Sequence, residues 1–380
     1  MKYNSYLLVA FLMAITAILL VPPAAMTTSG VLHQAAAQTA PTTTPDPLFI
    51  SDNGDNTIKV INTADGTGSV FIPKTDAGQN YVLKGPKGII AVGNTLYVAN
   101  QFANTGANGE IIKFDKATGT FAGYLVKHSD KNAPYAPRGI VLSPDGNSIY
   151  VASYVSKGDK EQGENPHVHF TPGYISQYDI TTGKLIKRYS TPAGFLGVNE
   201  FNPRGLVFHG GKLYVSVTDD QFVDTSVGYV LSCTCSPSSN SWKIVVASNK
   251  GNNYESGLHR PEGLVFSPDG EQLWVTSFRR LNSDGSIVDP DQLIAYNPTT
   301  GAKVDSILLY QSDQPRAFSQ AIVFGPEGKL FVPITNTGEL RSYDVSDHTY
   351  SVITSAGSPL QVPFYLSFGN TNPSTLDYKQ

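Results

Sequence analysis

RPEGLVFSPDGEQLWVTSF, residues 260–278, contains two apolar runs on either side of an Asp-Gly pair. Short apolar runs rich in Val, Leu and aromatic residues indicate β-strands that are buried on both faces. Asp269-Gly270 indicates a tight turn between them, because glycine accepts the positive φ that such turns demand. The stretch therefore predicts a β-hairpin, and it leaves Glu262 without a structural explanation.

The same frame recurs along the chain. Its parts are Pro-x-Gly, three or four apolar residues, a Gly-bearing turn and an aromatic-Val pair. Copies begin at Gly85, Ala136, Asn202, Arg260 and Phe318. Self-similarity of this kind is the signature of a repeat architecture.

A second signature follows in most copies. An alternating strand ends in Asp or Asn, a turn of the Thr-Gly type reverses the chain, and another strand leaves. Examples of the turn are DITTG at 179–183 and NPTTG at 297–301. Two strands from each signature give four strands per unit.

Two fragments at the ends of the repeat complete each other. Residues 48–72 supply the later strands of a unit without its first strand, and residues 363–368 supply a first strand with nothing after it. Pairing of the C-terminal strand with the strand that begins near Leu48 would close a ring and leave no open sheet edge. The sequence therefore predicts an all-β, six-bladed β-propeller with four-stranded antiparallel blades.

A family resemblance can be stated on two of these segments. PRGIVLSPDGNSIYVAS (137–153) and PEGLVFSPDGEQLWVTS (261–277) resemble blades of six-bladed propellers of the SMP-30/gluconolactonase, NHL-repeat and YVTN-repeat type. The resemblance covers residues 48–370. It is specific for architecture and not for activity, because blade sequences recur across unrelated functions.

Composition and the N-terminal segment indicate where the chain acts. Charged residues make up 15% of the 380, and the formal charge of −4 gives no footprint of nucleic-acid or anionic-membrane binding. Residues 1–37 place Lys2 before an apolar run, which predicts a secretory signal cut after Ala37 or Ala25, or else a retained membrane anchor. We expect a secreted or extracytoplasmic monomer, held at the cell surface if the segment is kept.

The remaining chain divides into three parts. A Thr/Pro-rich tether at 38–47 precedes the propeller at 48–370, and a C-terminal tail occupies 371–380. The cysteines, Cys233 and Cys235, lie two apart. Export permits a disulfide, but residues two apart on a strand are expected to bridge poorly. Ordinary strand cysteines, a redox-active bridge and a soft-metal site all stay open.

The resemblance places the middle residue of each Pro-x-Gly at the mouth of a central channel. These residues are Lys87, Arg138, Arg204, Glu262 and Gln320, with Phe364 from the closing strand. Residues just past the second strand of each blade would lie behind them: Asn53, Gln101, Tyr154, Asp219, Asp220, Phe278, Arg279 and Asn336. Such a polar, aromatic-lined concavity suits a small molecule or a peptide.

Glu262 has three interpretations. The gluconolactonase resemblance implies a divalent cation held by Glu, Asn and Asp, and Glu262 occupies a ligand-bearing position. Nearby cations oppose such a metal unless Asp219 or Asp220 reaches inward. As a counter-ion, Glu262 would pair instead with Arg204 or Arg138. In the third interpretation the cations of the mouth hold a carboxylate or a phosphate.

Two other groups suggest metal ligands. His167 and His169 alternate within an insertion, so on a strand they would face the same side and share zinc or copper. The NHL-type resemblance implies lyases that use channel histidines for zinc. A second loop is rich in carboxylates and contains Asp284, Asp289 and Asp291. Carboxylate oxygens suit calcium, although the spacing of these residues differs from that of an EF-hand. Surface histidines and a solvated turn are the alternatives.

The sequence contains no nucleophile elbow, P-loop or Rossmann pattern. It therefore favours a cell-surface or extracellular binding module whose loop-rich face engages a small anionic ligand, a glycan or a protein. The alternative is a metal-dependent hydrolase, lactonase or lyase at the same face. Its candidate ligands for Ca, Zn or Cu are Glu262, Asp219, His167 and His169.

Overall fold

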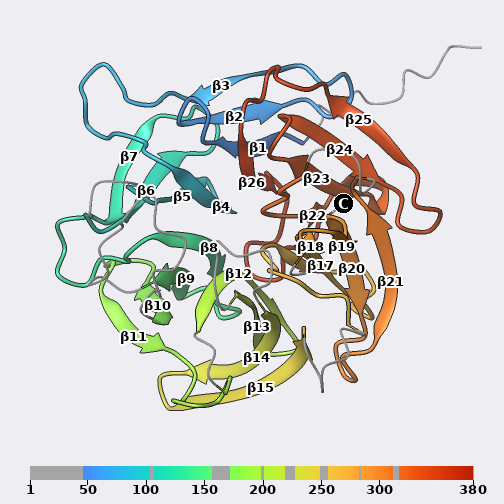
Figure 1. Ribbon diagram of the computed structural model, residues 1–380. Coiled ribbons are helices and arrows are strands. Elements are labelled where there is room, and N and C mark those ends of the chain that lie inside the picture. The colour runs from blue at the N-terminus through green and yellow to red at the C-terminus, as the bar shows by residue number, and fades with distance from the viewer. Residues whose placement is uncertain are drawn as a thin grey trace, which may run out of the picture. The chain divides into compact units, whose positions relative to one another are not determined.

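A computed structural model describes residues 46–102, 107–155, 172–197, 201–218, 227–248, 256–281, 284–310 and 316–379. They fall within one compact unit, Pro45–Gln380. Six four-stranded sheets surround a central channel (Figure 1). The predicted six-bladed β-propeller is confirmed.

Blades 1 to 3 are described from the channel outward. Blade 1 consists of β26 (Pro363–Phe368), β1 (Leu48–Asp52), β2 (Thr57–Ile61) and β3 (Gly68–Ile72). Blade 2 consists of β4 (Pro86–Val92), β5 (Thr95–Asn100), β6 (Glu110–Asp115) and β7 (Phe121–Val126). Blade 3 consists of β8 (Pro137–Leu142), β9 (Ser148–Val155), β10 (Pro172–Asp179) and β11 (Leu185–Tyr189).

Blades 4 to 6 repeat the same order. Blade 4 consists of β12 (Asn202–His209), β13 (Lys212–Thr218), β14 (Gly228–Ser236) and β15 (Ser239–Ala247). Blade 5 consists of β16 (Leu264–Phe266), β17 (Leu273–Ser277), β20 (Gln292–Tyr296) and β21 (Lys303–Leu308), with a small hairpin of β18 (Arg280–Leu281) and β19 (Ile287–Asp289). Blade 6 consists of β22 (Val323–Phe324), β23 (Leu330–Ile334), β24 (Glu339–Tyr343) and β25 (Tyr350–Thr354), with a 3-10 turn at Pro326–Gly328.

The ring closes between the two ends of the repeat. Strand β26 pairs antiparallel with β1, and Leu48 lies opposite Phe368. Ser51 adds a side-chain contact, since its hydroxyl accepts a hydrogen bond from the backbone N–H of Tyr365 at 2.9 Å. The incomplete first unit of the sequence thus receives its inner strand from the C-terminal end, as its fragments predict.

The glycine of each Pro-x-Gly frame is explained by the packing of neighbouring inner strands. A Cβ atom at Gly88 would lie 2.5 Å from the carbonyl oxygen of Arg138, and one at Gly139 would lie 2.5 Å from that of Arg204. Real Cβ atoms do not tolerate such contacts, so only glycine lets these strands approach. The close approach brings the middle residues of the frames into one ring.

Glycines of the Thr-Gly turns join the outer parts of neighbouring blades. Gly183 and Gly301 have φ near +70°, which suits the turn. A Cβ at Gly183 would also clash with the carbonyl of Leu125 on β7, and one at Gly301 with that of Val245 on β15. Each turn therefore packs against the outer strand of the preceding blade.

The hydrophobic core lies between the blades. One cluster combines Val141 and Tyr150 of blade 3 with Phe208 and Val215 of blade 4, and each is at least nine-tenths buried. Comparable clusters join the other neighbours around the ring. Burial on both faces of each sheet accounts for the nearly continuous apolar runs of the sequence.

The C-terminal tail crosses the channel at the end where the inner strands finish. Carbonyl oxygens of Pro373 and Ser374 accept hydrogen bonds from the backbone N–H groups of Leu142 and Phe208, both at 2.9 Å. Leu376 packs against hydrophobic clusters that involve blades 3 to 6. The tail therefore covers this end of the channel.

Cys233 and Cys235 are joined by a disulfide on β14. Their Cα atoms lie 5.2 Å apart, which is within the range of ordinary disulfides. The two Cα atoms lie closer together than residues two apart on a fully extended strand, and this brings the two sulfurs within reach of each other.

The predicted signal segment lies outside the described residues, as does most of the tether. In the part of the chain that is described, no helix is long and apolar enough to cross a membrane.

Candidate functional site

The mouth of the channel is the end at which the inner strands begin. Lys87 lies on β4, Arg138 on β8 and Arg204 on β12, each one residue after a proline. Glu262 and Gln320 precede the short strands β16 and β22 in blades 5 and 6. The residues x of the repeat frame thus come from five consecutive blades.

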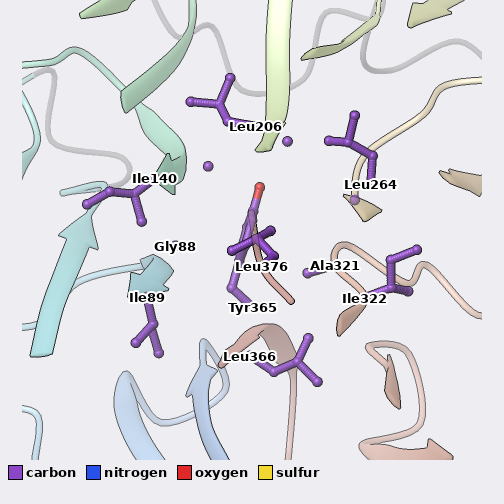
Figure 2. A pocket seen from close by; sticks show the side chains of 13 residues that line it. Gly88, Ile89, Ile140, Leu206, Leu264, Ala321, Ile322, Tyr365, Leu366 and Leu376 are labelled. Atoms are coloured by element: carbon purple, nitrogen blue, oxygen red, sulfur yellow. The ribbon is translucent and has the colours of Figure 1, made fainter. Parts of the chain in front are cut away.

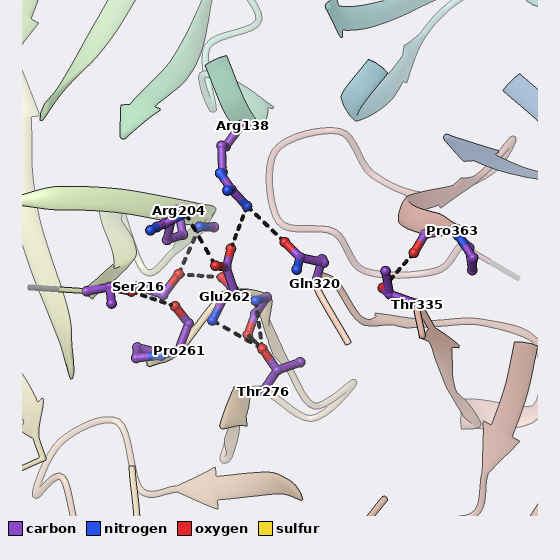
Figure 3. A network of polar contacts seen from close by, with 12 residues as sticks. Arg138, Arg204, Ser216, Pro261, Glu262, Thr276, Gln320, Thr335 and Pro363 are labelled. Atoms are coloured by element: carbon purple, nitrogen blue, oxygen red, sulfur yellow. Dashed lines mark hydrogen bonds and ion pairs between the residues drawn. The ribbon is translucent and has the colours of Figure 1, made fainter. Parts of the chain in front are cut away.

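Glu262 lies between two arginines (Figure 3). Its Oε2 accepts a hydrogen bond from Arg138 Nη1 at 3.2 Å, and its Oε1 lies 3.4 Å from Arg204 Nη1. The same Nη1 of Arg138 donates to Gln320 Oε1 at 2.8 Å. Glu262 is 5% exposed and Arg204 is 1% exposed. The counter-ion interpretation of Glu262 agrees with this geometry, and both arginines take part.

Hydroxyl groups on the second strands fix the backbone at Glu262. Ser216 Oγ donates to the Glu262 carbonyl oxygen at 2.5 Å and accepts from the N–H of Gly205 at 2.8 Å. Thr276 Oγ1 accepts from the N–H groups of Glu262 and Gly263 at 3.2 and 2.9 Å. Sequence reasoning missed these positioning residues. Their signal is a hydroxyl directly after the aromatic-Val pair.

Both arginines stay charged at neutral pH. Burial lowers the pKa of Arg204 to about 10, against the opposing effect of the Glu262 carboxylate. Burial also acts to lower the pKa of Arg138, but Glu262 and nearby tyrosines outweigh it and the pKa is raised. Two guanidinium ions therefore surround one carboxylate in a desolvated layer.

Aromatic rings support this layer. The ring of Tyr154 has its centroid 4.8 Å from the Arg138 guanidinium carbon and 4.7 Å from that of Arg204. Such contacts stabilise cations through the negative face of the ring. Tyr154, predicted at the mouth, thus contacts two of the predicted cations.

Lys87 has a different environment from the arginines. Its Nζ lies 3.4 Å from the centroid of the Phe364 ring. In the amide orientation that satisfies both of its groups, Asn53 donates to the Pro86 carbonyl at 2.6 Å and accepts from Lys87 Nζ at 2.7 Å. Lys87 is 4% exposed, and its pKa lies well below its usual value because of burial and then the charge of Arg138.

Below the charged layer the channel is narrow and mostly apolar. Figure 2 shows Ile89, Ile140 and other aliphatic side chains around it, with Tyr365 and Leu376 near the centre. The cavity measures about 40 Å³, which is room for a few water molecules and not for a sugar. The Tyr365 hydroxyl is buried without a hydrogen-bond partner among the described residues. Burial raises its pKa, so it stays a neutral donor.

A second group of cations and rings lies in blades 5 and 6. Arg316 lies 4.0 Å from the ring centroid of Phe318, and Arg260 lies 5.5 Å from that of Phe278. Asp291, which is 3% exposed, accepts backbone hydrogen bonds from Arg279 and Ala317, each at 2.8 Å. The hypothesis of a solvated turn was wrong for Asp291, which ties two loops together.

The other predicted residues are distributed as follows. Phe278 is buried and packs edge-on against Phe318. Asn336 lies in an exposed turn after β23. His167, His169, Asp219 and Asp220 lie outside the described residues.

The described residues do not fit a divalent metal. Among them, no group of three or more His, Cys, Asp or Glu side chains is placed to hold one. Both oxygens of Glu262 face guanidinium groups. In the calcium-type loop, Asp284 accepts from Ser286 and Asp289 pairs with Arg280.

Comparison with solved structures finds propellers. The chain is similar to the periplasmic gluconolactonase of Pseudomonas aeruginosa (15% identity, TM-score 0.48), covering 85% of this chain and 98% of that one. It is also similar to a gluconolactonase from Xanthomonas campestris (14% identity, TM-score 0.47), covering 82% of this chain and 86% of that one. A third similar structure is virginiamycin B lyase from Staphylococcus aureus (15% identity, TM-score 0.46), covering 82% of this chain and 85% of that one.

These structures agree with the resemblance of the blade sequences. Their names describe two gluconolactonases and a lyase. At this identity the likeness concerns the fold alone. No family model and no curated protein matches the chain.

Proposed function

We propose that the mouth of the channel binds a small organic anion through a carboxylate or phosphate group. The observation that carries the proposal is the position of Arg138 and Lys87. They occupy the same frame position on neighbouring inner strands at the mouth, and the carboxylate that pairs with Arg138, that of Glu262, is shared with Arg204. Arg and Lys are the usual partners of carboxylates and phosphates.

The shape of the channel sets where this anion lies. The 40 Å³ cavity below the charged layer excludes an organic ligand, and the tail covers the far end. The ligand therefore enters and leaves at the mouth, where it contacts Arg138 and Lys87. Tyr154 holds the arginine side chain in place through its ring.

A thermal-shift titration tests the proposal. Acetate, gluconate and phosphate are added to the purified protein at constant ionic strength, with sorbitol as the uncharged match for gluconate. A specific anion raises the melting temperature by mass action, and sorbitol does not. Arg138→Gln should weaken the effect on the order of tenfold or more in Kd. Equal shifts with sorbitol, or none with any anion, would refute the proposal.

Lactone hydrolysis at the same place is the second candidate function. The observation in its favour is a buried carboxylate, Glu262, at the mouth among guanidinium groups. A lactone opens to a carboxylate, which is an anion of the class proposed to bind there. Acid release from glucono-δ-lactone, measured with and without added Ca²⁺, Zn²⁺ or Cu²⁺, separates the two functions. Loss of that activity in Glu262→Gln would support hydrolysis, and no release above the buffer rate would exclude it.

We also propose that the chain acts outside the cytoplasm. The apolar N-terminal run and the Cys233–Cys235 disulfide support this, because disulfides persist in oxidising compartments. Fractionation of the producing cells, with N-terminal sequencing of the recovered protein, tests both export and the cut after Ala37 or Ala25. Recovery of the uncut chain in the cytoplasm would contradict the proposal.

A further inference from the structure

Lys87 is buried, and it has no acidic partner in the part of the chain that the structure describes. Its side chain is 4% exposed and makes no ion pair with any residue that the structure describes. Its hydrogen bond goes to the neutral amide of Asn53, and its nitrogen rests on the face of Phe364. A lysine in such a place is not explained by a salt bridge.

The surroundings of Lys87 favour the neutral amine. The inner strand β4 packs closely against β8, as shown by the contact that a Cβ at Gly88 would make with Arg138. The charged groups that act on Lys87 are Arg138, Arg204 and Glu262, from blades 3, 4 and 5. The two guanidinium ions and burial disfavour a third cation, and Glu262 is already shared by both arginines. A lysine that is desolvated beside another cation is the known form of an amine nucleophile.

We propose that Lys87 forms an imine with the carbonyl group of a 2-oxo carboxylate held at the mouth. The inference rests on the proposed anion site. The amine nitrogen adds to the carbonyl carbon, and a proton moves from nitrogen to the carbonyl oxygen to give a carbinolamine. Loss of the hydroxyl group with a second proton releases one water and leaves the C=N bond.

The arrangement of the mouth selects this class of ligand. A 2-oxo carboxylate carries its anionic group on the carbon next to the carbonyl. Arg138 and Lys87 occupy the same frame position on neighbouring inner strands, and Arg138 is the charged group that acts most strongly on Lys87. In the proposed complex the guanidinium binds the carboxylate and the amine attacks the adjacent carbonyl. The planar guanidinium of arginine matches the two oxygens of a carboxylate, and the flexible side chain of lysine can reach the carbonyl carbon.

Asn53 and Phe364 have roles in this scheme. Asn53 holds the nitrogen in one position through its amide oxygen. The face of Phe364 stabilises a cation, and the protonated imine is a cation. The ring therefore favours the adduct over the neutral starting amine.

Reductive trapping tests the inference. The purified protein is incubated with pyruvate and sodium cyanoborohydride at about pH 7.5. Intact mass and peptide mapping then locate the reduced adduct. Lactate, which has the carboxylate but no carbonyl, is the matched ligand. Lys184, an exposed lysine in a turn, provides the matched variant Lys184→Arg. We expect one adduct at Lys87 that forms before any adduct at an exposed lysine, because a lowered pKa leaves more of the amine unprotonated.

The outcomes are distinguishable. Lys87→Arg should abolish the adduct, Lys184→Arg should not, and excess lactate should slow trapping in the unmodified protein, which keeps the test valid if Lys87→Arg fails to fold. Label spread over exposed lysines would overturn the inference. If pyruvate and lactate both raise the melting temperature but no adduct forms, the result refutes the imine and supports the anion site. If neither binds, the proposed anion site falls as well.

Discussion

Replacing Glu262 by Gln removes the negative charge of the mouth and nearly preserves its shape. The carboxylate oxygens lie 3.2 and 3.4 Å from two guanidinium nitrogens. Each contact is worth about 5 kcal/mol of Coulomb energy at an effective dielectric constant of 20, before the desolvation that offsets much of it. Loss of one partner from a buried ion pair costs about 3–5 kcal/mol. We therefore expect Glu262→Gln to lower the free energy of unfolding by about 3–5 kcal/mol.

Arg138→Gln is the matched control, because it breaks the same Arg138–Glu262 ion pair by removing the cation and not the anion. It removes a cation and leaves Glu262 paired with Arg204. We expect a smaller loss, about 1–3 kcal/mol, which reflects the lost hydrogen bond to Gln320 and the lost ring contact. The order of the two losses is the point of the comparison, since both variants remove the Arg138–Glu262 pair.

Urea unfolding at low, constant ionic strength measures both losses, with far-UV circular dichroism as the signal and the slope m as a check on the unfolded state. Added formate should restore part of the stability of Glu262→Gln, because a small carboxylate can take the place of the lost charge. The reasoning is refuted if Glu262→Gln stays within about 0.5 kcal/mol of the unmodified protein, or if Arg138→Gln costs more.

Three other predictions concern the scaffold and Lys87. Gly183→Ala should lower the unfolding free energy by at least about 1 kcal/mol more than Gly146→Ala, because both have positive φ but only the former clashes, with the carbonyl of Leu125; equal melting temperatures would contradict this. Leu376→Ala should cost about 1–3 kcal/mol in thermal unfolding by enlarging the cavity under the mouth, and an unchanged melting temperature would show that the tail does not hold the channel end. In the folded protein the pKa of Lys87 lies below 10.5, its value in the unfolded chain. At a pH between the folded and the unfolded pKa, the unfolded chain therefore binds more protons, and the free energy of unfolding rises with pH. Lys87→Met should therefore be more stable than the unmodified protein at about pH 6, and the difference should shrink towards about pH 10; a difference that does not change with pH would contradict the shift.

The number of blades and the closure of the ring were predictable from the sequence, because both depend on local patterns. Each hairpin carries its own turn residues, and the two incomplete fragments are complementary. The reason for the glycines was predictable only in part. Turn chemistry explains the φ of Gly183, but its contact with Leu125 lies 58 residues away in the chain, 183 − 125, and depends on how one blade packs on the next.

The sequence predicts which residues lie at the candidate site, but it does not predict which of them form ion pairs with each other. The repeat frame identifies residue x of each blade, so Arg138, Arg204 and Glu262 could be placed in one ring. Which of them pair depends on side-chain directions across the channel, which no local pattern contains. Asp291 shows the same limit, because its burial follows from the loop at Ala317 folding against it.

The pairing of β1 with β26 also orders the events of folding. Ser51 and Tyr365, which join these strands, are separated by 314 residues. During synthesis the first blade has three of its strands and lacks the fourth until the last residues of the chain emerge. The growing chain is thus an open spiral of sheets whose unpaired edge at β1 is available to other chains, and contacts of such high sequence separation form slowly. A deletion that reaches β26 would therefore remove the inner strand of the N-terminal blade, although the two lie at opposite ends of the chain.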